Sequence, residues 1–158
     1  MDYGVSLAIA GGMAAVMFGG WGSACGLRHA GAQTAGALAE KPELFGKLLV
    51  LTALPGTQGF YGLIGAIIIA LKTGLIAGKP AVTTPQGIAL FATGFGLGVV
   101  LCISAINQGQ TSAACISLTA RKPEEGGRSI LFPALVETYA VVALLAAILM
   151  VFWILPAK

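Results

Sequence analysis

Residues 130–155 read ILFPALVETYAVVALLAAILMVFWIL, an apolar run interrupted by a single charged side chain, Glu137. The run is longer than the roughly 20 apolar residues that cross a bilayer as a helix. It also lacks the strict alternation of a barrel strand. Because a backbone inside lipid must satisfy its own hydrogen bonds, we predict a transmembrane helix here.

Three further apolar runs precede this one. They extend from about Val5 to beyond Gly26, from about Phe45 to Leu71, and from about Ile88 to Ile106 with a small and polar extension to about Ala120. Hydrophobic residues make up 57% of the 158 residues and charged residues 9%, whereas a soluble domain carries about 25% charged residues. We therefore predict an all-α membrane protein of four transmembrane helices, with no room for a soluble catalytic domain. The net charge of +3 is too small and scattered to indicate nucleic-acid binding.

Basic residues indicate how the helices are oriented. Six lie near the first and third connections, namely Arg28, Lys41, Lys47, Arg121, Lys122 and Arg128. Three lie on the other side, namely Lys72, Lys79 and Lys158. Since basic residues accumulate on the cytoplasmic side, we predict a multi-pass protein of the cell membrane with cytoplasmic connections near 40–43 and 121–128. Both termini are then extracytoplasmic, and the acidic Asp2 argues against a cleavable signal peptide.

An internal repeat relates the two halves of the sequence. The tripeptide Lys-Pro-Glu at 41–43 recurs at 122–124, a shift of 81 residues. The same shift gives three further pairs: Ser23 with Ser104, Thr57 with Thr138, and Gly56 with Glu137. We therefore predict two tandem helical hairpins in the same orientation, residues 1–78 and 79–158. They share one acidic site, carried by the second hairpin.

Glu137 is the one acidic residue inside an apolar run. A carboxylate at membrane depth is costly, so it normally faces protein or water and has a partner. Uncharged partners are available on the second and third helices, namely Thr57, Gln58, Tyr61, Asn107, Gln108 and Gln110. A carboxylate with neutral oxygens suits a hard monovalent cation, whereas a proton needs only the carboxylate and one hydrogen-bond partner. A protonated acid bonded inside a bundle is the interpretation without transport.

Proline and glycine indicate how the helices pack. Pro55 should disrupt the hydrogen bond to the Leu51 carbonyl and kink the second helix, either exposing backbone oxygen beside the polar cluster or acting only in packing. Glycines crowd the first and third helices, at Gly12, Gly19, Gly20, Gly22, Gly26, Gly94, Gly96 and Gly98. Because small residues let helices approach closely in lipid, these two helices form either the inner wall of a ring or the contact within one bundle.

No pattern in the sequence indicates catalysis. There is no Ser-His-Asp set, no metal cluster and no phosphate-binding loop. His29, the only histidine, is expected at the membrane interface near the cytoplasmic end of the first helix. Cys25, Cys102 and Cys115 have no metal-ligand spacing and are expected to be small packing residues.

Two motifs carry a resemblance to a known family. The segments LPGTQGFYG at 54–62 and LVETYA at 135–140, together with the two Lys-Pro-Glu turns, resemble the duplicated proteolipid of rotary ATPases. The similarity is closest to the K subunits of bacterial V-type (A/V-type) ATPases and covers nearly the whole chain. It implies a ring of identical subunits in the lipid bilayer that turns against a stator subunit with an essential arginine. The cytoplasmic loops would dock on the central stalk, and ATP hydrolysis would belong to partner subunits.

The resemblance also implies a set of ligands and an ion. In sodium-transporting members of the family the matching positions are Glu137, Gln108, Thr57, Gln58 and the carbonyl of Leu54. Tyr61 matches a tyrosine that hydrogen-bonds the glutamate and closes the site. The proline argument points to the Leu51 carbonyl instead of Leu54. We expect Na⁺ as the transported ion, with H⁺ as the alternative, and a small four-helix cation antiporter or a purely structural protein as the other classes.

Overall fold

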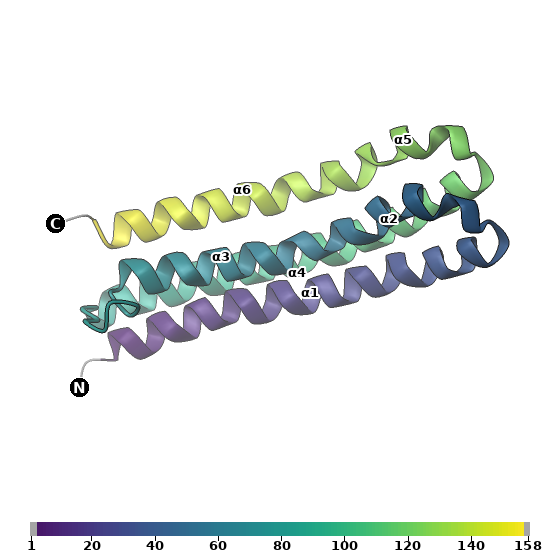
Figure 1. Cartoon of the computed structure of the whole chain (residues 1–158). Helices are drawn as coiled ribbons and strands as arrows, with labels where there is room; N and C mark the ends of the chain where they lie inside the picture. Colours follow the sequence, from purple (N-terminus) through teal and green to yellow (C-terminus); the bar gives the residue numbers. More distant parts are fainter. Residues whose placement is uncertain (1–2, 157–158) are drawn as a thin grey trace.

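The computed structural model describes residues 3–156, so Asp2 and Lys158, which enter the predictions on a signal peptide and on orientation, lie outside the described residues. Helices account for most of this range, and no strand occurs within it (Figure 1). In chain order the elements are α1 (Gly4–Glu40), η1 (Pro42–Leu44), α2 (Phe45–Ala53), η2 (Leu54–Gly56), α3 (Thr57–Lys72), α4 (Thr84–Arg121), η3 (Pro123–Glu125), α5 (Gly126–Ser129) and α6 (Leu131–Ile154).

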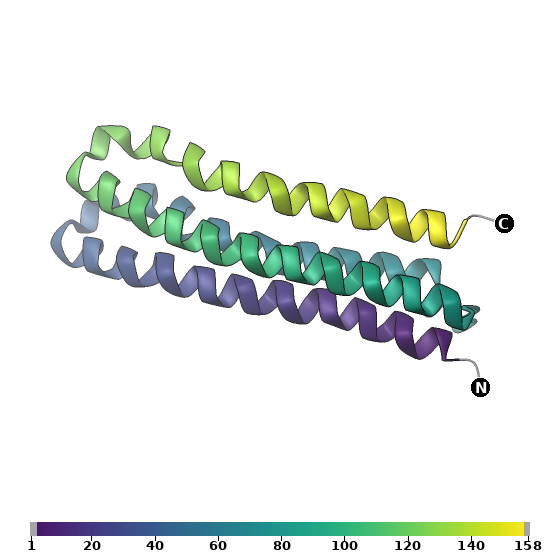
Figure 2. The same ribbon diagram turned by 180° about the vertical axis from the view of Figure 1, so that it is seen from behind.

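Four segments are long and apolar enough to cross a membrane. They are Gly4–Glu40, Pro42–Lys72, Thr84–Arg121 and Pro123–Ile154. The segments run alternately in opposite directions, so both ends of the chain and the connection between α3 and α4 lie at one end of the molecule (Figures 1 and 2). The turns from α1 to α2 and from α4 to α5 lie at the opposite end. The predicted all-α membrane fold with four spanning helices is confirmed.

Helices α1 and α4 run parallel and pack on each other more extensively than any other pair. Glycine makes this approach possible, because the backbone of one helix occupies the space that a side chain would need on the other. A Cβ added to Gly94 would collide with the Gly11 carbonyl, and one added to Gly109 would collide with Gly26. A Cβ on Gly22 would lie 2.5 Å from the Cα of Cys102. Tight packing of the two glycine-rich helices thus occurs within one chain.

The other two spanning segments lie over this pair. Helix α3 packs on α1, while α6 packs on α4 and α3 and lies away from α1 (Figures 1 and 2). Large apolar side chains cover the outer side of α6, including Leu131, Leu135, Leu149 and Trp153, all more than half exposed. A surface of this kind is suited to lipid rather than water. The contact between α3, α4 and α6 is where Glu137 lies.

Helix boundaries differ from the sequence predictions in two places. Helix α4 begins at Thr84, ahead of the third apolar run, and holds Pro85 in its first turn, because a missing N–H is tolerated there. Thr83 and Gln86 form a capping box around that turn, with the Thr83 N–H 3.0 Å from Gln86 Oε1. Helix α1 continues well past His29 to Glu40, since the intervening residues are mostly alanine and other helix formers and the first proline is Pro42. The expectation that His29 lies near the end of the helix is therefore wrong.

Two lysines of the first hairpin form hydrogen bonds to the turn of the second hairpin. Lys41 Nζ donates to the Ala120 carbonyl at 2.7 Å, and Lys47 Nζ donates to the Pro123 carbonyl at 3.0 Å. The last carbonyls of a helix have no partner within the helix, and basic side chains commonly satisfy them. The Lys-Pro-Glu turn of the first hairpin therefore stabilises the end of α4 in the second.

Close packing of α1 on α4 predicts a strong dependence on glycine position. Gly22→Ala should destabilise the protein by about 1–3 kcal/mol, because the added methyl group overpacks a backbone contact. Gly20→Ala is the control, since no atom lies within 4 Å of a Cβ at that position. Unfolding by titration with a denaturing detergent measures both. Equal losses for the two variants would contradict this packing.

Candidate ion-binding site

Glu137 lies half-buried in the second turn of α6, where α3 and α4 both reach its carboxylate. The Tyr61 hydroxyl of α3 donates to Glu137 Oε1 at 2.6 Å. Gln108 of α4 points its Nε2 at Glu137 Oε2, 3.4 Å away, and at the Pro133 carbonyl, 3.0 Å away. The carboxylate, carried by α6, is therefore contacted by α3 of the first hairpin and by α4 of the second.

Two glutamines form the inner part of the cluster, and both side chains are fully buried. Gln58 Nε2 of α3 donates to Gln108 Oε1 at 2.6 Å. Burying an amide is costly unless its donors and acceptors are satisfied, and this contact satisfies one end of each. Gln108 thus connects Gln58 to Glu137 and makes one continuous polar network of the three residues.

The remaining candidate ion ligands lie at the interruption of the helix at Pro55. The break that proline predicts is present as the 3-10 turn η2 between α2 and α3. Immediately after it, the Thr57 hydroxyl lies 3.0 Å from the Leu54 carbonyl and 3.4 Å from Gln58 Oε1. The Thr57 N–H also donates to the Leu54 carbonyl. Three oxygens, from Leu54, Thr57 and Gln58, therefore gather at the start of α3.

Not every residue named from the sequence belongs to the cluster. Asn107 is exposed, and its Nδ2 donates to the Ile103 carbonyl of its own helix. Gln110 is exposed as well. Neither contacts Glu137 through any hydrogen bond found among residues 3–156. Both therefore lie apart from the network, because on a helix residues one and two positions from Gln108 face other directions.

Sequence reasoning missed one serine that contacts the network and a second that joins helices beside it. Ser104 Oγ lies 3.4 Å from Gln58 Nε2 and 3.2 Å from the Val136 carbonyl. Ser23 Oγ accepts a hydrogen bond of 2.8 Å from the Gly59 N–H. The internal repeat pairs these two serines, and this pairing was the available signal. Serine is so common in membrane helices that the pairing alone did not indicate a site.

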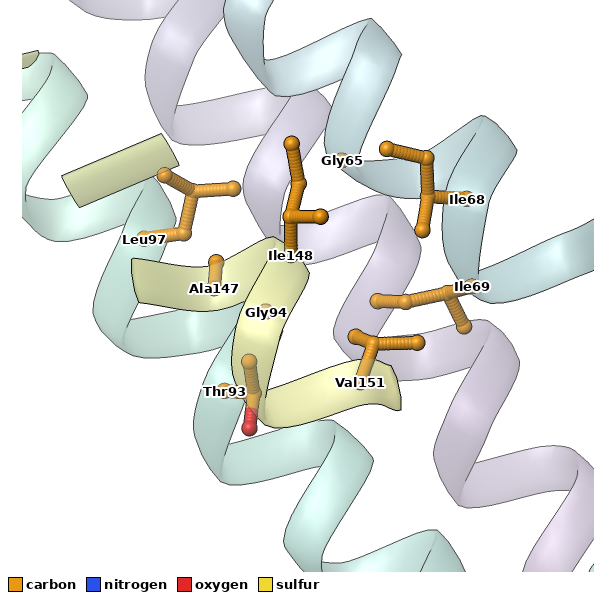
Figure 3. Close-up of a pocket in the computed structure, with 9 residues that line it drawn as sticks. All are labelled: Gly65, Ile68, Ile69, Thr93, Gly94, Leu97, Ala147, Ile148 and Val151. Carbon is orange, nitrogen blue, oxygen red and sulfur yellow. The ribbon is translucent and has the colours of Figure 1, made fainter. Parts of the chain in front are cut away.

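Apolar packing closes the site above and below along the helices. Toward the termini, α3, α4 and α6 enclose a cavity of only about 10 Å³, lined by Ile69, Leu97, Ile148 and Val151 among others (Figure 3). Its one hydroxyl, that of Thr93, donates to the Ala89 carbonyl. Toward the hairpin turns lies an apolar cluster of buried residues that includes Leu48, Leu51 and Ile116. Apolar side chains therefore flank the site in both directions along the helices.

The charge of Glu137 has no fixed counterpart among the described residues. Throughout residues 3–156 the one ion pair is the exposed contact of Arg128 with Glu125, at 3.3 Å. The same range holds no group of three or more His, Cys, Asp or Glu residues placed to bind a metal. The groups around Glu137 are hydroxyls, amides and carbonyls. Such a site can neutralise its carboxylate with a proton or with one small cation held by oxygen.

The fold and the site together define a class of protein: a duplicated helical hairpin in the membrane with one carboxylate among neutral oxygens. Comparison with known proteins gives the family. The family of the ATP synthase C subunit matches residues 6–69 and 91–150. The chain therefore belongs to this family, whose members typically form rings, and is a rotor-ring subunit of the V/A type.

Two curated relatives were found along most of the chain. The V-type sodium ATPase subunit K of Enterococcus hirae is 34% identical over 157 residues, covering 96% of this chain and 97% of the relative. The A-type ATP synthase subunit K of Methanocaldococcus jannaschii is 38% identical over 132 residues, which cover 84% of this chain. The aligned part spans 57% of the length of the archaeal relative.

Tyr61 supplies the shortest contact to the carboxylate, which predicts a measurable effect of its removal. Tyr61→Phe deletes the 2.6 Å hydrogen bond to Glu137. A hydrogen bond to a charged group contributes about 1.5–3 kcal/mol, so its loss leaves the carboxyl group less constrained and more open to reagents. Glu137 should therefore be labelled by a carbodiimide several times faster in the variant. Tyr139→Phe, on an exposed side chain next to the site, is the control; an equal rise there would contradict the role of the Tyr61 contact.

Proposed function

We propose that the chain carries sodium ions across the membrane by binding and releasing them at Glu137 as the ring rotates. The observation that supports this most is a carboxylate at membrane depth with no basic partner in the described residues and with only uncharged hydroxyl and amide groups in contact with it. An uncompensated carboxylate in lipid is costly. A sodium ion bound to Glu137 neutralises that charge and allows the site to travel through the bilayer.

The choice of sodium over a proton rests on the polar groups that the site contains beyond the Tyr61 hydroxyl. A proton on Glu137 would need only one acceptor or donor nearby, and Tyr61 meets that need. The chain additionally buries Gln58 and Gln108 completely, which costs free energy unless their oxygens are used. Gln108 Oε1 accepts one hydrogen bond from Gln58 and retains a second lone pair for a cation.

The spacing of the oxygens at the start of α3 also fits a cation. Thr57 Oγ1 and Gln58 Oε1 are 3.4 Å apart. Ca²⁺, a hard cation like sodium, takes oxygen ligands at roughly 2.3–2.6 Å, and two such ligands at right angles lie about this far apart. We therefore assign Glu137, Gln108, Thr57, Gln58 and the Leu54 carbonyl as the sodium ligands. Tyr61 keeps the carboxylate in place and closes the site.

Transport then follows from where the site is closed. Apolar side chains flank the site in both directions along the axis of the subunit. The ion therefore enters and leaves sideways, where an essential arginine of the stator competes for Glu137 and water rehydrates the ion. The hairpin turns near 40–43 and 121–128 face the cytoplasm and dock on the central stalk, with the hairpins divided between residues 78 and 79. ATP is hydrolysed by partner subunits.

Glu137 is the carboxylate on which the proposal depends. Glu137→Gln should abolish sodium transport and the coupled ATPase activity of the assembled complex. The ring should still assemble, because an amide of nearly the same volume replaces the acid and can accept from Tyr61. Transport into proteoliposomes and the size of the purified ring are the measurements. Coupled transport by this variant at the wild-type rate would refute the assignment.

Sodium and protons should compete for the same carboxylate. Sodium should protect Glu137 from carbodiimide labelling, and more sodium should be needed as the pH falls. Gln108→Leu or Thr57→Val should raise the sodium concentration for half-protection more than it changes labelling without sodium. Asn107→Leu is the matched control, as an exposed amide one residue away from Gln108. Labelling that is indifferent to sodium over a wide range would leave the proton as the transported ion.

A further inference from the structure

We propose that Ser104 is a positioning residue of the ion site, which fixes the side-chain amide of Gln58 so that its oxygen faces the bound cation. The inference rests on the proposed binding of sodium at Glu137. Ser104 is 6% exposed and lies one helical turn before Gln108 on α4. It contacts both Gln58 and the backbone beside Glu137, and it is not one of the assigned ligands.

The hydroxyl of Ser104 has a single hydrogen, and the Val136 carbonyl accepts it at 3.2 Å. A carbonyl can only accept, so the donor of this contact is fixed. The Ser104 oxygen therefore presents a lone pair to its other neighbour, the Gln58 side chain. A lone pair can accept from the amide nitrogen and repels the amide oxygen, so it distinguishes the two ends of the amide.

Gln58 is then held in one orientation by two acceptors. Its Nε2 donates to Gln108 Oε1 at 2.6 Å and, over a longer 3.4 Å, to Ser104 Oγ. With both hydrogens of the nitrogen used, Oε1 points to the opposite side, where the Thr57 hydroxyl lies 3.4 Å away. A flipped amide would place its oxygen against two oxygens and withdraw a ligand from the cation. Ser104 thus stabilises the binding orientation.

The first hairpin uses the matching serine differently. Ser23, the repeat partner of Ser104, is also 6% exposed but accepts from the backbone N–H of Gly59. The position that matches Glu137 in that hairpin is Gly56, so there is no carboxylate to serve. A buried serine that only joins helices in one repeat therefore orients a side chain in the other.

The test uses carbodiimide labelling of Glu137 in the purified full-length ring, with sodium chloride as the probe. Ser104→Ala should raise the sodium concentration for half-protection about fivefold, the effect of roughly 1 kcal/mol at 1.4 kcal/mol per tenfold. The dependence of labelling on pH without sodium should not change, because the contacts of Tyr61 and Gln108 to Glu137 remain. Ser112→Ala is the control: this serine is fully buried on the same helix, and its hydroxyl has no hydrogen-bond partner among the described residues.

Each outcome decides between the proposals. If sodium fails to protect the wild-type ring, the proposed function falls and this inference falls with it. If the wild type is protected and Ser104→Ala matches it, only the role of Ser104 is overturned. If the pH dependence of labelling without sodium also differs between Ser104→Ala and the wild type, the substitution has loosened α6 at Val136. That result would overturn the proposal that Ser104 only positions Gln58. Should Ser104→Ala not assemble, Ser104→Cys keeps a weaker thiol donor and acceptor, and the same comparison applies with a smaller expected rise.

Discussion

The electrostatic cost of one carboxylate in lipid governs this molecule. Glu137 lies half-buried on a helix covered with apolar side chains, and no basic residue pairs with it within the described chain. Within the described residues no base balances its charge, and a proton or a cation could do so. The contacts of Tyr61 and Gln108 stabilise the carboxylate without neutralising it, because both are uncharged. A carboxylate whose charge is balanced by an exchangeable ion is suited to carrying ions, whereas one paired permanently with a base is not.

Two features of the backbone allow that site to exist. Glycines let α1 and α4 meet backbone to backbone, so that Gln108 and Ser104 stand on a rigid pair of helices. The turn η2 at Pro55 interrupts the outer segment and brings the Leu54 carbonyl, Thr57 and Gln58 together at the start of α3. Apolar side chains flank the polar network in both directions along the helices. The polar network therefore depends on the packing of α1 against α4 and on the turn at Pro55.

Much of this could be predicted from the sequence. Length and composition indicated four spanning helices, and the isolated acid in the run 130–155 identified Glu137. The proline at position 55 predicted the break that η2 shows. The sequence could not predict which neighbour of Glu137 lies inward: Gln108 is buried, while Asn107 and Gln110 face away, because helix rotation is set by packing and not by composition. Ser104 was missed for the same reason, since its function depends on which side chain lies opposite it across a helix contact.

We propose that each chain binds one sodium ion, although it contains two copies of the hairpin. The decisive measurement is equilibrium binding of radioactive sodium to the purified, detergent-solubilised ring, with the protein concentration known from amino-acid analysis. One sodium ion per chain should bind at neutral or alkaline pH and should be displaced as protons are added. Two ions per chain would mean that the hairpin with Gly56 also binds, and none at any sodium concentration would contradict sodium transport at Glu137.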